Sequence, residues 1–114
     1  MDKIALRVVD LLQIFERYFI SLNYKGGFAF FVFILCIAEL KHAERPVALK
    51  ALGDSLAAEM GYSSYMALDS KIRSAISELH EASPGELAQL GIFPKRRTIP
   101  GLAEALAEFL LNGS

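Results

Sequence analysis

The amino-acid sequence predicts an all-α fold of about five helices in a small bundle, and a homodimer that shares the apolar second helix. Three observations support this prediction. Apolar residues recur at spacings of three and four along most of the 114-residue chain, which is the period of a helix with one buried side. Glycine, proline and serine interrupt these segments where helices usually start and stop. One segment is apolar nearly all round, and such a helix must be buried on most sides.

The composition indicates a single domain with more apolar residues than one small core needs. A chain of 114 residues forms one domain, here residues 1–114. Hydrophobic residues make up 54% of the chain, against a usual fraction of ~45–50%. The surplus suggests a second partner for burial, and the net charge of −1 argues weakly against direct nucleic-acid binding.

The first helix is expected from residue 2 to residue 22. One stripe at spacings of three and four forms its buried side: Ile4, Val8, Leu11, Phe15, Phe19 and Leu22. Ile14 and Tyr18 fall instead near Arg17 on the charged side, with Leu6 on the same flank. They are either scattered surface residues, which are common, or part of a contact surface.

The second helix is expected from residue 28 to residue 42, after the turn "NYKGG" at residues 23–27. It contains eleven apolar residues in succession, Phe28 to Ala38, whereas a membrane span needs about 20. We therefore expect a buried helix shared with a second copy or a partner, no membrane association, and an inert, buried Cys36. Charges interrupt the N-terminal segment, so no secretory signal is expected, and the chain is expected to be cytoplasmic.

The next two helices are expected at residues 46–60 and from about residue 64 to residue 79. Pro46 is suited to the first turn of a helix, Gly53 weakens that helix and Gly61 ends it, and Ser63 or Ser64 caps the next one. This pair has the rhythm of a helix-turn-helix, but two helices joined by a glycine turn are also very common. In the DNA-binding interpretation the outward residues are Ser63, Ser64, Tyr65, Asp69, Ser70 and Arg73, and "FPKRR" forms a basic wing.

The C-terminal third contains a short helix and a last long one. "SPGE", residues 83–86, is a capping box that starts a short helix ended by Gly91. The stretch "IFPKRRTIP", residues 92–100, is expected to be irregular or extended, with a short extended segment near Phe93 to Ile99. The last helix starts near Pro100 and ends at Asn112, and Glu104 and Glu108 form an acidic edge that also carries Leu111.

No catalytic pattern is present in the sequence. The two histidines, His42 and His80, have no ligand partners at metal-binding spacing, and no phosphate-binding or nucleophile motif is found. We therefore expect no enzyme activity, no cofactor and no metal. The aromatic and apolar surplus instead predicts a protein-binding surface, unless all of these residues pack inside one monomer. The candidate partner-binding residues are Leu6, Ile14, Arg17, Tyr18, Tyr24, Phe28 and Leu111.

The whole chain resembles the QslA family of small antiactivators. The resemblance covers "IALRVVDLLQIFERYFISLNY", "KGGFAFFVFILCIAELKHAERP" and "KRRTIPGLAEALAEFLLNGS", and it is one of length and overall character rather than of a signature motif. It implies a helical homodimer that binds the ligand-binding domain of a LuxR-type quorum-sensing regulator such as LasR, blocks its dimerisation and so prevents promoter binding. It implies no catalytic residues and no direct contact with nucleic acid. The alternative is a small helix-turn-helix DNA-binding regulator.

Overall fold

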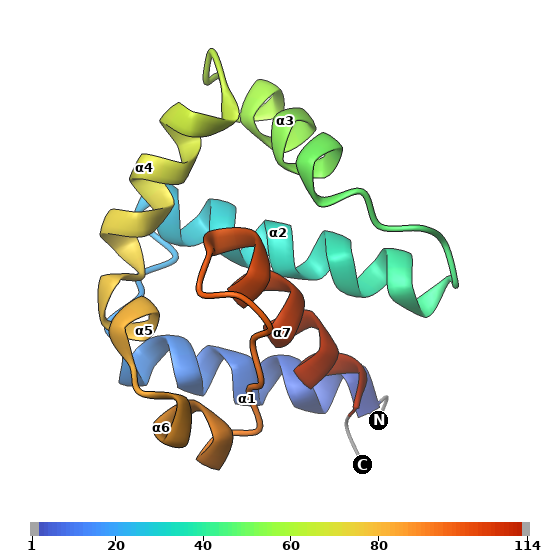
Figure 1. The fold of residues 1–114 in the computed structure, drawn as a ribbon, viewed down its shortest axis with the longest axis vertical. Helices are drawn as coiled ribbons and strands as arrows, with labels where there is room; N and C mark the ends of the chain where they lie inside the picture. Colours follow the sequence, from blue (N-terminus) through green and yellow to red (C-terminus); the bar gives the residue numbers. More distant parts are fainter. Residues whose placement is uncertain (1–2, 113–114) are drawn as a thin grey trace.

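A computed structural model describes residues 3–112, and the side chains of residues 7–112. Within this range the chain forms seven helices and no strand (Figure 1): α1 (Lys3–Arg17), α2 (Lys25–His42), α3 (Leu49–Glu59), α4 (Tyr65–Ala75), α5 (Ser77–Glu81), α6 (Pro84–Gln89) and α7 (Ile99–Leu111). The predicted small all-α bundle is confirmed for these residues. The number of helices is higher than the predicted five.

Helix α2 is the centre of the fold. α7 packs across both α2 and α1, α4 packs on α2, and α3 packs on α4 (Figure 1). Phe30, Phe33 and Leu106 are completely buried in this arrangement, and the Phe15 ring stacks on Phe30 with centroids 6.0 Å apart. Arg7 fastens α1 to α7, because its Nε donates to the carbonyl of Phe109 at 3.2 Å. The buried side of α2 therefore organises the whole domain.

The first helix is shorter than predicted, because α1 ends at Arg17. The N–H of Ile20 donates to the carbonyl of Phe15 at 2.8 Å and that of Phe19 to Glu16 at 3.1 Å, which is the pair of bonds that defines a Schellman motif. Phe19 has a left-handed backbone, with φ of 57°. Phe19 and Leu22 are 80% and 38% exposed, so their predicted place in the buried stripe is wrong.

Three more helices end in the same motif. At the ends of α2, α3 and α6 the left-handed residues are Glu44, Gly61 and Gly91, with φ of 56°, 81° and 81°. Gly61 and Gly91 are the two ends that the sequence predicts, because glycine adopts this conformation without steric cost. The ends at Phe19 and Glu44 carry no glycine and therefore no such signal.

The two glycines that the sequence places in a turn before the second helix do not form that turn. Gly26 and Gly27 lie inside α2, which starts at Lys25, three residues earlier than expected. A Cβ at Gly26 would lie 2.2 Å from the carbonyl oxygen of Lys71, and one at Gly27 would lie 2.2 Å from that of Ser21. These residues therefore allow the backbones of α4 and of the α1–α2 connection to approach α2 closely.

The middle of the chain also differs in detail. α3 starts at Leu49, with Ala48 as its N-cap. Residues 45–48 form a non-helical connection after the Schellman motif at Glu44, so Pro46 lies before the helix and does not open it. Gly53 is buried, and a Cβ there would lie 2.8 Å from the Tyr65 ring. Its absence of a side chain allows α3 to pack against α4, so Gly53 has a packing role rather than being only a weak point.

The helix predicted to extend to residue 79 is divided at Ile76, where ψ changes to 21°. The two serine caps are confirmed: Ser64 accepts from the N–H of Ala67, and Ser83 from that of Glu86. The second half of the predicted capping box is replaced, because the Glu86 carboxylate accepts from the Tyr18 hydroxyl. Residues 92–98 are irregular, as expected, but no strand forms within the described part of the chain. Thr98 caps α7 by accepting from the N–H of Gly101.

Candidate protein-binding face

Two predicted contact residues belong to the core. Ile14 and Tyr18 are each only 6% exposed, so the prediction that they form an exposed contact surface is wrong. The reason is that α6 and α7 cover that side of α1. The Tyr18 hydroxyl donates to Oε1 of Glu86 in α6 at 2.8 Å, and Ile14 lies beside Leu90 and Phe109.

The other five predicted residues are dispersed. Arg17, Tyr24 and Phe28 are exposed, and Leu111 is partly buried at the end of α7. Leu6 lies in α1, but its side chain is outside the described residues. Arg17 borders the groove between α1 and α6, whereas Tyr24 and Phe28 follow one another at the start of α2. The structure therefore groups only Tyr24 and Phe28.

An apolar face forms between residues 9 and 35. Eight large hydrophobic side chains are exposed within the described part of the chain, and all but Met66 and Phe93 come from residues 9–28. We define the apolar face as these six residues and three partly buried neighbours: Val9, Leu12, Phe19, Leu22, Tyr24, Phe28, Phe31, Val32 and Leu35. The exposed apolar residues of the described part therefore come mainly from α1, the start of α2 and the connection between them.

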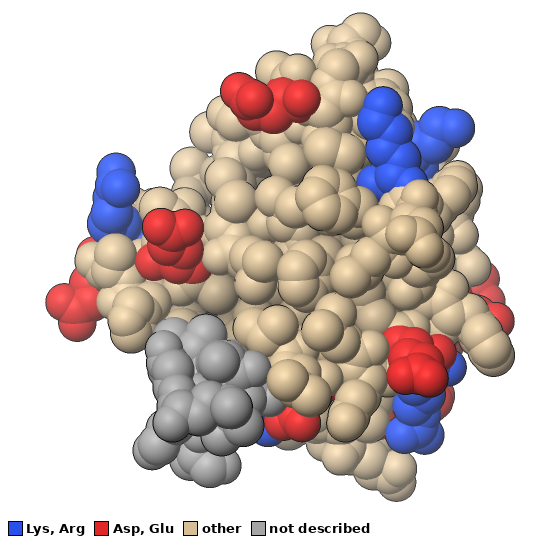
Figure 2. Space-filling view, turned by 180° about the vertical axis from the view of Figure 1, so that it is seen from behind, with Lys and Arg blue, Asp and Glu red and all other residues tan. Residues whose placement is uncertain are grey.

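The outer side of α2 forms the middle of this face. Phe28, Val32 and Leu35 follow at spacings of four and three, so they lie along one line of the helix opposite its buried side. The Phe31 ring meets Phe15 edge-on with centroids 5.8 Å apart, which joins this line to α1. Figure 2 views the molecule from the side opposite to α7 and shows charges around the margin and an uncharged centre.

The connection between α1 and α2 forms one end of the apolar face. Phe19 and Tyr24 line the same hollow, against Ser74 and Ala75 at the end of α4. A bulky residue in left-handed backbone is an outlier, and such strain is most common at functional positions. The ring of Phe19 is exposed to water, so it contributes little to the stability of the fold. Sequence reasoning placed Phe19 in the core, because the apolar period continues through it and no glycine marks the helix end.

The size of the apolar face suits a protein partner. Aromatic side chains have areas of ~150–250 Å², so the exposed fractions of Phe19, Tyr24 and Phe28, which are 80%, 43% and 46%, leave on the order of 350 Å² in the open. The aliphatic members raise the total to roughly 600 Å², where one side of a standard interface is ~800 Å². The face therefore has most of the area that one stable protein contact needs, and two contacts made at the same time would each extend beyond it.

The helix-turn-helix candidates are only partly exposed. Ser63, Ser64, Ser70 and Arg73 face solvent, but Asp69 is half-buried. Tyr65 points inward rather than outward, because its ring packs edge-on against Phe33 with centroids 6.4 Å apart. Arg73 is paired with Asp69 at 3.4 Å, which takes one cation of the expected DNA-facing set into an ion pair.

The metal-ligating side chains of the described residues are dispersed. No group of three metal-ligating side chains is found among them. Cys36 is half-buried rather than fully buried, and burial, together with the charge of Glu39, raises the pKa of its thiol, which disfavours the reactive thiolate. None of the helices within residues 3–112 combines the length and apolar character needed to cross a membrane.

No protein-family model, curated protein or solved structure matches this chain. The resemblance to the antiactivators therefore stays a prediction.

Proposed function

We propose that this protein is a homodimeric antiactivator. It binds the ligand-binding domain of a LuxR-type transcription factor of the LasR kind, blocks its dimerisation and so prevents its binding to promoters. The observation that supports a protein-binding role is the uncharged apolar face of residues 9–35, with the strained and exposed Phe19 at its end. The identity of the target rests on the sequence resemblance. The regulator is a cytoplasmic protein, which assigns this chain to the cytoplasm.

We assign the contact with the second copy of the chain to the outer line of α2. Lys25, Phe28, Val32, Leu35 and Glu39 follow at spacings of three, four, three and four, which is the spacing of a helix–helix seam. In an antiparallel pair centred on Val32, Phe28 approaches Leu35 of the second copy and Lys25 approaches Glu39. A two-fold contact must be self-complementary in this way. The Lys25 ammonium already lies 5.0 Å from the centre of the Tyr62 ring in its own chain. The additional pairing with Glu39 of the second copy is therefore expected to set the register of the two helices more than the affinity of the dimer.

Sedimentation equilibrium tests this pairing. The wild-type protein is expected to be a dimer and Val32→Asp a monomer, because a carboxylate at the centre of an apolar contact is not paired. Glu39→Lys should weaken the dimer and Lys25→Glu/Glu39→Lys should restore it. A wild-type monomer at the highest soluble concentration would exclude the dimer.

We assign the contact with the target to the end of the apolar face at the connection between α1 and α2, where Phe19, Leu22 and Tyr24 are exposed. A LuxR-type regulator needs two DNA-reading helices at a fixed separation, so covering its dimer surface removes the paired geometry. Aromatic anchors surrounded by polar residues are typical of binding hot spots. No cofactor is needed for this mechanism.

Light scattering after size exclusion tests the target. The protein is mixed with the autoinducer-bound ligand-binding domain, and a discrete mixed complex is expected in place of the regulator dimer. Tyr24→Asp should abolish the complex, while Met66→Asp should not, because Met66 is 81% exposed but lies outside the apolar face. A regulator that stays dimeric would reject the target. Complex formation by Tyr24→Asp would move the contact elsewhere.

A helix-turn-helix DNA-binding protein is the second candidate. The observation in its favour is the packing of α3 and α4 on α2, with Gly61 in left-handed backbone at the turn, which is the arrangement of a three-helix DNA-binding unit. Lys71→Ala/Arg73→Ala should then weaken DNA binding and reduce its dependence on salt. An unchanged salt dependence would reject this function.

A further inference from the structure

A cavity of about 650 Å³ lies between α3, α4 and the segment that leads into α7. Its volume falls within the usual range of small-molecule sites, roughly 300–1,000 Å³. Leu49, Tyr65 and Pro100 supply apolar walls. This cavity is separate from the apolar face, and the proposed function does not use it.

Three cations line the cavity: Lys50, Lys95 and Arg96. None of them forms an ion pair within the described part of the chain. The carboxylate in the lining, Glu104, lies 3.7 Å from Lys41 outside the cavity and is partly neutralised by it. The lining therefore carries a net positive charge that the fold itself does not use.

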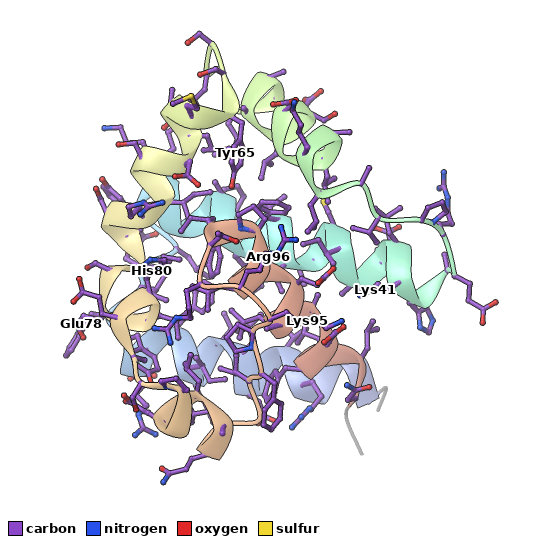
Figure 3. All side chains as sticks on the ribbon, in the orientation of Figure 1. Lys41, Tyr65, Glu78, His80, Lys95 and Arg96 are labelled. Atoms are coloured by element: carbon purple, nitrogen blue, oxygen red, sulfur yellow. The ribbon has the colours of Figure 1, made fainter. Side chains whose placement is uncertain are left out.

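The segment that carries Lys95 and Arg96 is anchored on both sides. Arg97 donates to the carbonyl oxygens of His80 and Ala82. A Cβ at Gly101 would lie 2.4 Å from the carbonyl oxygen of Arg96, so this glycine lets the segment fold tightly against the first turn of α7. Figure 3 shows Tyr65, Arg96 and Lys95 one below another through the middle of the view, Tyr65 from α4 and the two cations from the segment before α7.

Tyr65 gives the cavity a fixed aromatic wall. Its ring is held between Gly53 and the ring of Phe33. Its hydroxyl is shielded from solvent. Burial, and then the charge and hydrogen bonding of the Asp69 carboxylate, raise the pKa of this hydroxyl, so Asp69 is its neighbour and Tyr65 contributes its ring to the cavity. The wall and the cations together suit a ligand with one apolar part and one anionic part.

We propose that this cavity binds a small amphipathic oxyanion, an alkyl carboxylate or an alkyl phosphate. The anionic group lies between Lys50, Lys95 and Arg96, and the alkyl chain lies against Leu49 and Tyr65. A guanidinium and two ammonium groups bind either oxyanion with charge-assisted hydrogen bonds. Nucleic acid fits less well, because its backbone needs a row of cations across an open face, whereas these three line one cavity with apolar walls.

Calorimetric titration of the full chain tests this site. The probes are octanoate, octyl phosphate, inorganic phosphate and the neutral octyl glucoside, all below micellar concentrations. We expect at least one of the two alkyl anions to bind, and to bind more tightly than inorganic phosphate or the glucoside. The tighter of the two identifies the preferred oxyanion. No binding of either alkyl anion, or equal binding of the glucoside, would overturn the proposal.

Two variants and a control locate the binding. Arg96→Gln and Lys95→Gln should each weaken the binding of the preferred anion about tenfold, the loss of one charge-assisted bond. Arg45→Gln removes an exposed cation that does not line the cavity and should leave binding unchanged. Unfolding midpoints equal to that of the wild type confirm intact folding. Binding that survives Arg96→Gln and Lys95→Gln, or a duplex DNA oligonucleotide that binds while the alkyl anions do not, would overturn the assignment.

Discussion

Phe19→Gly separates the stability of this protein from its binding function. Phe19 is the left-handed residue of the motif that ends α1, with φ of 57°, and its ring is 80% exposed. Glycine favours this backbone conformation, so the substitution removes strain and a ring that contributes little to the core. The proposed target contact, in contrast, depends on that ring.

The expected stability change is small because three terms nearly cancel. Left-handed backbone costs an L residue about 1–2 kcal/mol, which glycine recovers. The buried fifth of the ring contributes about 0.5 kcal/mol, and the added freedom of glycine in the unfolded chain costs about 0.4–1 kcal/mol. Phe19→Gly should therefore lie between about 0.5 kcal/mol less stable and about 1 kcal/mol more stable than the wild type. Phe33 is completely buried, so Phe33→Ala should lower the free energy of unfolding by about 3–5 kcal/mol.

Urea unfolding followed by circular dichroism measures these changes, and size exclusion with the regulator domain measures binding. Phe19→Gly should fold normally and lose the complex. Glu44→Gly is the matched control, because Glu44 occupies the same position at the end of α2, with φ of 56°, and should keep the complex. A loss of more than about 2 kcal/mol in Phe19→Gly would show that the ring is part of the core. A complex that survives would remove Phe19 from the contact.

Three further predictions concern packing and ionisation. Gly85→Ala should raise the free energy of unfolding by about 0.5–1 kcal/mol, because nothing lies within 4 Å of the added Cβ. Gly26 occupies the same second position of its own helix, but its Cβ would lie 2.2 Å from the Lys71 carbonyl oxygen. Gly26→Ala should therefore lower the free energy of unfolding by about 1–3 kcal/mol. Equal urea midpoints for the two variants would disprove the close approach of α2 and α4. Tyr18→Phe should cost about 1.5 kcal/mol through the lost bond to Glu86, and an unchanged midpoint at neutral pH would refute this. Burial, followed by that hydrogen bond, raises the pKa of Tyr18 above 10.0. The stability that the protonated Tyr18 hydroxyl contributes is therefore complete below pH 10 and is lost as the pH rises through the folded-state pKa. In urea titrations above pH 10 the stability of Tyr18→Phe should fall less steeply than that of the wild type, and parallel curves would contradict the assignment.

The sequence by itself determined those features whose cause is local. Ser64, Ser83, Gly61 and Gly91 start or end helices through their own hydrogen bonds or backbone freedom, so their positions were predicted correctly. The uninterrupted apolar residues of α2 and the apolar period of α7 likewise identified two helices of the core, because a helix that is buried on several sides requires apolar residues around it.

The tertiary structure decided which apolar residues are buried. Ile14 and Tyr18 appeared to lie on a free side of α1, but α6, which is distant in sequence, covers that side through Glu86. Phe19 continues the apolar period and still lies in water, because the chain turns at a position without glycine. Helical period gives the direction of a side chain around its own helix, and only the packing of other helices determines whether that direction leads into the core or to the surface.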